Sequence, residues 1–72
     1  MTFRTVIYYQ GKIYKGKWTK GTREDLETHS ELMELLYDRE DVQKLTLDTE
    51  SGGKLHFHSK ILESAVIELE VQ

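Results

Sequence analysis

The pattern that most restricts the fold of this chain is the alternation of side chains in residues 2–18. Two runs rich in β-branched and aromatic residues flank Gln10-Gly11, a short turn that contains glycine. If these two residues form the loop of a β-hairpin, the register continues to the facing pair Phe3 and Trp18. Facing residues share a side of the sheet. One side then holds Phe3, Ile7, Tyr9, Tyr14 and Trp18, and the other holds Arg4, Val6, Tyr8, Ile13, Lys15 and Lys17.

A helix is predicted after the turn at residues 19–21. Thr22 is suited to cap it with its hydroxyl, and acids follow in the first turn, where the helix dipole favours negative charge. Thr28 or Ser30 offers an alternative start. Apolar residues at helical spacing form a stripe made of Leu26, Leu32, Met33, Leu35, Leu36 and Tyr37. Acids occupy the other side, which is typical of a solvated helix face, and a polar linker at 38–41 ends the helix.

Three further strands are predicted in the second half of the chain. Val42 to Asp48 reads as a strand, and Ser51-Gly52-Gly53 is a turn. Lys54 to His58 is predicted as the next strand, with its leucine and phenylalanine pointing inward and its two histidines pointing outward. The last strand, Ala65 to Val71, alternates apolar residues with valine and glutamates.

This order, β-β-α-β-β-β, predicts a single small α+β domain over residues 1–72. It comprises an N-terminal hairpin, one helix packed on a face of an antiparallel sheet, and a C-terminal meander of three strands. A small curled β-barrel with the helix at one end is the alternative. The predicted core consists of Phe3, Ile7, Tyr14, Trp18, Leu26, Leu32, Met33, Leu36, Leu45, Leu47, Leu55, Phe57, Ile67 and Leu69.

The size and composition of the chain limit how it is stabilised and where it works. A domain of 72 residues has a marginal core, and it has no cysteine for a disulfide or a thiolate zinc site. Oligomerisation is the remaining way to add stability, so we expect a homodimer. We find no signal peptide, and no run of about 20 apolar residues that a membrane helix needs. We therefore expect a cytoplasmic protein that does not bind membranes.

The charge of the chain is divided along its length. Residues 1–23 contain six basic side chains and no acid, whereas residues 24–72 contain all thirteen acids and four basic side chains. The two segments carry +6 and −9, which gives the net charge of −3. Such a division raises the expectation of a charged partner without naming it. Contact between the two segments, within one chain or between two copies, would satisfy the same charges.

The basic hairpin is the first candidate binding site. Surfaces that bind nucleic acids combine cations for the phosphates with flat rings on which bases stack. The candidate partner-binding residues are Arg4, Tyr8, Lys12, Ile13, Lys15, Lys17 and Lys20. An ordinary solvated strand face explains the same residues. The net negative charge of the chain also weakens attraction to phosphate.

No constellation of residues predicts catalysis. His56 and His58 point to one side of a strand, but zinc needs at least three protein ligands, so two exposed histidines are the simpler interpretation. Ser51-Gly52-Gly53-Lys54 has the composition of a phosphate loop without its spacing or its helix. We expect no enzymatic activity, no metal, no cofactor and no small-molecule substrate.

The sequence favours a small non-enzymatic interaction protein, such as a regulator, inhibitor or adaptor that docks to another macromolecule. The partner is expected to be a protein or a second copy of the chain. A nucleic-acid-binding module that uses the basic hairpin is the alternative. No motif matches a named family residue by residue, and chains of this kind are common among accessory proteins of bacteria and phages.

Overall fold

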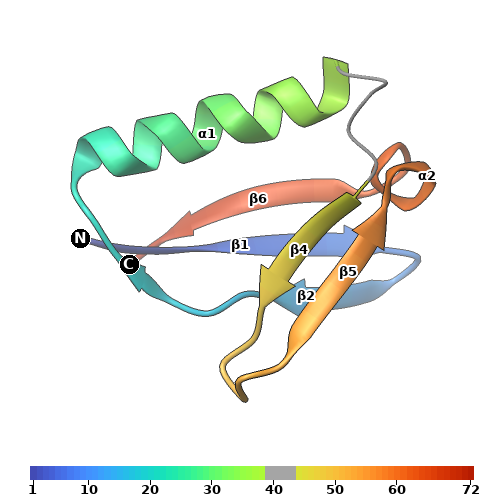
Figure 1. The fold of residues 1–72 in the computed structure, drawn as a ribbon, viewed down its shortest axis with the longest axis horizontal. Helices are drawn as coiled ribbons and strands as arrows, with labels where there is room; N and C mark the ends of the chain where they lie inside the picture. The colour runs from blue at the N-terminus through green and yellow to red at the C-terminus, as the bar shows by residue number, and fades with distance from the viewer. Residues whose placement is uncertain (39–43) are drawn as a thin grey trace.

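The protein is a small α+β domain built from antiparallel strands and one main helix (Figure 1). The computed structural model describes residues 1–38 and 44–72, with the backbone alone at 35–38. The elements are β1 (Thr2–Tyr9), β2 (Lys12–Lys15), β3 (Thr19–Lys20), α1 (Arg23–Asp38), β4 (Lys44–Asp48), β5 (Lys54–His58), α2 (Ser59–Leu62) and β6 (Val66–Val71). The predicted fold class is confirmed, and the strands of the described residues do not close into a barrel.

The N-terminal hairpin has the predicted turn and register. Ile7 pairs with Tyr14, and the ladder between β1 and β2 runs without a shift. Gln10 has a φ of 48° and Gly11 a φ of 76°. Two successive positive φ angles characterise the two-residue turn whose twist matches that of the flanking strands. Glycine adopts the second angle without strain, and so the turn sets the register of the hairpin.

The register shifts by one residue beyond β2. Gly16 still lies opposite Thr5, whose carbonyl accepts a 2.8 Å hydrogen bond from its amide, but Thr19 rather than Trp18 faces Phe3. Two residues, Lys17 and Trp18, therefore stand opposite the single residue between Thr5 and Phe3, which is a β-bulge. The prediction that Trp18 enters the core is wrong, because this extra residue turns its side chain to the other side of the sheet.

The last strand does not continue the predicted meander. β6 pairs with β1 over six residue pairs, whereas β4 and β5 form a separate two-stranded sheet. β1 is therefore the central strand, with β2 and β3 along one edge and β6 along the other. The hairpin of β4 and β5 crosses in front of this sheet (Figure 1). The short helix α2, which the sequence did not predict, separates β5 from β6 and places Leu62 in the core.

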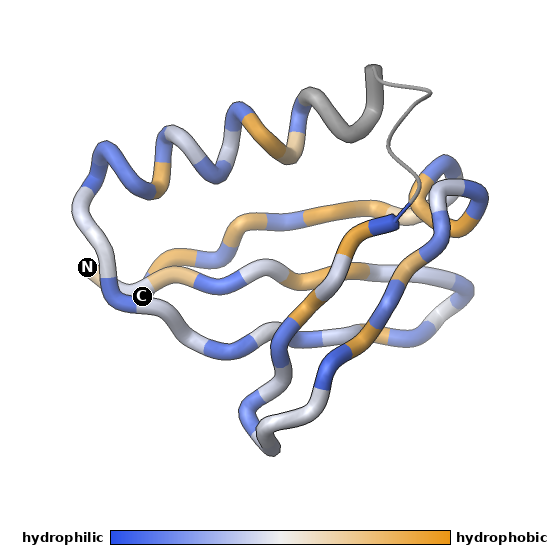
Figure 2. Tube along the Cα trace, in the orientation of Figure 1, coloured by the Kyte–Doolittle hydropathy of each residue, from blue (hydrophilic) through white to orange (hydrophobic). Residues whose placement is uncertain are grey.

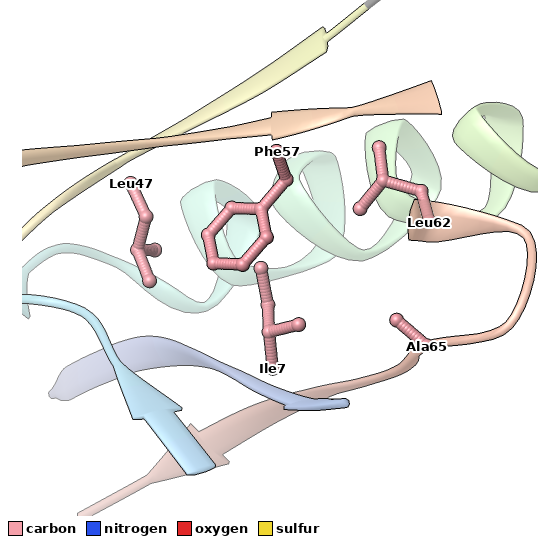
Figure 3. Packing of buried hydrophobic residues seen from close by; sticks show 5 residues of the cluster. All are labelled: Ile7, Leu47, Phe57, Leu62 and Ala65. Carbon is pink, nitrogen blue, oxygen red and sulfur yellow. The ribbon is translucent and has the colours of Figure 1, made fainter. Parts of the chain in front are cut away.

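The core lies between the central sheet and the β4–β5 hairpin. Its buried cluster consists of Ile7, Leu47, Phe57, Leu62 and Ala65, whose side chains converge from four segments of the chain (Figure 3). Tyr14 packs against this cluster and meets the ring of Phe57 edge-on, with 5.3 Å between the ring centroids. Gly16 permits the close approach of β4, because a Cβ there would lie 2.7 Å from a methyl carbon of Leu47.

Helix α1 starts at the predicted cap but contributes little to the core. The hydroxyl of Thr22 accepts a hydrogen bond from the Asp25 amide, and the Asp25 carboxylate accepts one from the Thr22 amide. Apolar positions along the helix are separated by polar ones (Figure 2). Leu26 and Met33 are only half-buried, and Leu32 is 51% exposed, so its predicted place in the core is wrong. The ring of Phe3 meets the helix at His29.

The remaining predictions divide into those that the structure describes and those that it does not. β5 has the predicted bounds, with Phe57 inward and the two histidines outward. The predicted linker beyond Asp38, the residues Val42 and Gln43, and the side chain of Leu36 lie outside the described residues. Val6, predicted for the outer side, is fully buried there.

Candidate interaction surface

The side of the central sheet that faces away from the core is the candidate site. No element of the described residues packs on it. We call it the open face, and its side chains come from three strands and the bulge. The open face consists of Arg4, Val6 and Tyr8 from β1, Ile13 and Lys15 from β2, Val66, Glu68 and Glu70 from β6, and Trp18.

The first transverse row of the open face is apolar. Tyr8 pairs with Ile13 on one side and with Val66 on the other, so these side chains lie directly beside one another. Val66 is 62% exposed, Ile13 57% and Tyr8 37%. Single exposed apolar residues are ordinary on a protein surface, but contiguous ones mark places of interaction. The row therefore singles out this end of the sheet.

The second row places opposite charges on either side of a buried valine. Val6 pairs with Lys15 of β2 and with Glu68 of β6. No helix or strand in the described part of the chain packs over this side of Val6, yet Val6 is 0% exposed. Its neighbours in the row carry long side chains, whose stems can cover apolar surface while their charged ends stay in water. The long side chains of the second row can therefore keep the valine between them out of water.

The third row is a stacked ion pair. The Arg4 guanidinium donates to a carboxylate oxygen of Glu70, at 2.7 Å from Nη2 and 3.1 Å from Nε. The same guanidinium lies 4.2 Å from the ring centroid of Trp18, close enough for a cation–π interaction. The Arg4 side chain keeps only 13% of its exposure. The bulge therefore supplies the ring on which Arg4 rests.

A hydrogen bond links the first row to the second. The Tyr8 hydroxyl donates to a Glu68 carboxylate oxygen at 2.9 Å. This hydrogen bond raises the pKa of Tyr8 above its ordinary value, and the negative charges of Glu68 and Glu70 act in the same direction. The edge of the open face along β6 is acidic through these two glutamates, and the edge along β2 is basic through Lys15. The two edges of one face therefore carry opposite charge.

Four of the seven predicted partner-binding residues lie on the open face: Arg4, Tyr8, Ile13 and Lys15. The other three lie outside its three rows. Lys12 pairs with Tyr9, whose side chain packs toward the core. Lys20 pairs with Thr2, which points to the same side of the sheet as Arg4, so Lys20 lies on the side of the open face but beyond its third row. Lys17 leaves the ladder and donates its amide to the carbonyl of Asp48, at 2.7 Å.

The structure adds four residues that sequence reasoning missed as site residues: Trp18, Val66, Glu68 and Glu70. The alternation of the last strand already placed the valine and both glutamates on one side. Its pairing with β1 was not visible in that pattern. Arg4 and Tyr8 both donate hydrogen bonds to these glutamates, so part of their hydrogen-bonding capacity is used within the open face.

The histidines do not form a site with neighbouring ligands. His56 and His58 are exposed on the outer side of the β4–β5 hairpin, as predicted, and a ring nitrogen of His56 lies 3.1 Å from the Thr46 hydroxyl. Among residues 1–38 and 44–72, no three His, Cys, Asp or Glu side chains are grouped closely enough to hold a metal ion.

Two shallow hollows flank α1. One, of about 260 Å³, lies between the helix and β4, and is lined by residues that include Phe3, His29 and Leu45. The other, of about 300 Å³, lies between the helix and β6, beside Leu26 and Leu69. Both follow from the loose packing of the helix. Within the described part of the chain, no helix has the length and apolar character needed to cross a membrane.

Comparison of the chain with protein families, with curated proteins and with solved structures gives no match.

Proposed function

We propose that the protein acts without catalysis, by docking to another protein through the open face. The observation that carries this proposal is the apolar row Val66, Tyr8 and Ile13, which three adjacent strands present side by side. Interface centres combine such an apolar strip, often with an aromatic residue, and a rim of polar side chains. Here the rim consists of Glu68, Lys15 and the Arg4–Glu70 pair.

The polar groups around the row support recognition rather than chemistry. Arg4 and Tyr8 are each bonded to a glutamate of β6. Such pairs hold side chains in fixed positions, which lowers the entropy lost when a partner binds. Charged groups at a rim also reject partners of the wrong charge pattern. A partner is therefore expected to place apolar side chains on the row and charges of both signs around it.

A capture experiment with matched variants tests the proposal. The immobilised full chain is exposed to native host lysate beside Ile13→Asp and the control Leu32→Asp. Ile13 is 57% exposed on the open face and Leu32 51% exposed on α1, so the two changes cost the fold similar amounts. Proteins retained by the parent and by Leu32→Asp, but lost with Ile13→Asp, are the expected result. Equal capture by all three chains would contradict the proposal.

A further inference from the structure

We propose that the occupant of the open face is a second copy of this chain, related by a two-fold axis that runs parallel to β1. This inference rests on the proposed function, because it names the partner of the same surface. It is carried by the arrangement of charge on the open face. The β6 edge holds Glu68 and the β2 edge holds Lys15, at equal distances on either side of Val6 in the central strand.

Two sheets that pack face to face about a two-fold axis have two simple arrangements. An axis across the strands places β6 over β6 of the partner subunit, so Glu68 would approach Glu68 of the partner subunit. An axis along β1 exchanges the two edges instead. It places Glu68 over Lys15 of the partner subunit, and the symmetry repeats this contact on the other edge. Like charges oppose the first arrangement and opposite charges favour the second.

The apolar row fits the same axis. Rotation about β1 keeps every transverse row over its own copy, because positions along the strand direction do not change. Val66 then lies over Ile13 of the partner subunit, and Tyr8 lies over Tyr8 of the partner subunit. All three apolar side chains of the row leave water together. Sheets packed in this aligned way are rotated by about 30°, which keeps the contacts nearest the axis in place.

The third row does not oppose this arrangement. Arg4 approaches Arg4 of the partner subunit across the axis, but its guanidinium is bonded to Glu70 and rests on Trp18. Its charge is therefore largely neutralised before a second copy arrives. The face spans three strands, which are about 4.8 Å apart. An interface of this size belongs to the smaller and weaker class, so the dimer is expected to dissociate on dilution.

Charge reversal across the two edges tests the axis. In Glu68→Lys both edges of the face are basic, and in Lys15→Glu both are acidic, so each variant opposes like charges in its own dimer. An equimolar mixture restores every opposite pair. Sedimentation of the full chain should show dimerisation weakened about tenfold or more in each variant alone, because two exposed pairs change sign. The mixture should dimerise as the parent does, which misfolded variants could not do.

The same measurements contain the results that would overturn the inference. Single reversals without effect on a parental dimer would overturn the axis along β1. A mixture that then dimerises more tightly than the parent would indicate the axis across the strands, and an unchanged mixture would place the interface elsewhere. A parent that stays monomeric at all concentrations also overturns it. If Ile13-dependent capture of a host protein then persists, the docking function stands and only the second copy is excluded. If that capture is absent too, both proposals fail.

Discussion

The central sheet buries one side chain of β1 completely on each of its two sides, but the surroundings of these two side chains differ. On the core side, Ile7 is covered by side chains from β4, β5 and the segment around α2, all distant in the sequence. On the open side, Val6 is as fully buried as Ile7, although no described helix or strand packs over it and its neighbours in the sheet are Lys15 and Glu68. The core side therefore depends on long-range packing, and the open side depends on pairs between neighbouring strands. Substitutions on the two sides should differ in size and in kind.

The largest difference is expected between two aromatic residues. Phe57→Ala should lower the free energy of unfolding by about 3–5 kcal/mol, since it leaves a cavity in the core. Trp18→Ala should cost only about 1–2 kcal/mol, since Trp18 is half-buried and its main partner is the Arg4 guanidinium. Urea unfolding of both variants measures the gap. If both variants lost the same free energy of unfolding, Trp18 would lie in the core, and the β-bulge that turns it outward would be contradicted.

A methyl group added at Gly16, where β4 comes close to the sheet, should lower the stability of the core side by a smaller amount. In Gly16→Ala the new methyl would lie 2.7 Å from a Leu47 methyl and 3.0 Å from the Thr5 carbonyl oxygen. Leu47 is buried and the carbonyl is backbone, so neither can move aside easily. Overpacking of this kind costs about 1–3 kcal/mol. The thermal midpoint of unfolding, compared with that of Gly53→Ala in the exposed turn, checks the prediction, and equal midpoints would contradict it.

Acid should weaken the N-terminal cap of α1. The hydrogen bond from the Thr22 amide lowers the pKa of Asp25 below its ordinary value of 3.8. Its stabilising effect is therefore complete above that value and is lost as the pH falls through the lower pKa of the folded state. Asp25→Asn should remove this fall of stability with decreasing pH, whereas Glu24→Gln should leave it unchanged. Helical circular dichroism during acid titration distinguishes them.

Nucleic-acid binding is the smallest effect that we expect. The parent chain should show no salt-sensitive binding to short DNA or RNA, because Arg4 is paired with Glu70 and the chain carries a net negative charge. A double change, Lys15→Glu with Lys17→Glu, should leave that result unaltered. Fluorescence anisotropy at two salt concentrations provides the measurement. Binding that falls steeply with salt and disappears in the double variant would replace the protein partner by a nucleic acid.

The N-terminal hairpin was predictable because its order is local. A two-residue turn fixes the pairing of Ile7 with Tyr14, and the alternation of side chains confirms the same register. The bulge was not predicted, although Gly16 offered a signal, because a glycine inside a strand often marks a bulge or a close backbone approach. The turn chemistry of residues 51–53 was equally readable, and β4 and β5 pair as expected.

The open face could not be assembled from the sequence because it depends on strand order. The alternation of the last strand placed Glu68 and Glu70 on one side, but sequential pairing with β5 was the simpler expectation. The one-turn helix α2 directs the chain away from β5 and brings β6 beside β1. Similarly, the apolar stripe of α1 predicted burial at Leu32, but the helix lies too loosely on the sheet to provide it.

The position of β6 beside β1 also bears on how the domain folds. Its contacts join residues far apart in the chain, such as Arg4 with Glu70, 66 positions away, and Tyr8 with Glu68, 60 positions away. Pairings with such separation raise the contact order and slow folding, because the closure of a long loop precedes any gain. Until β6 arrives, one edge of β1 has no partner strand. That interval is when the chain is most exposed to pairing with the wrong strand.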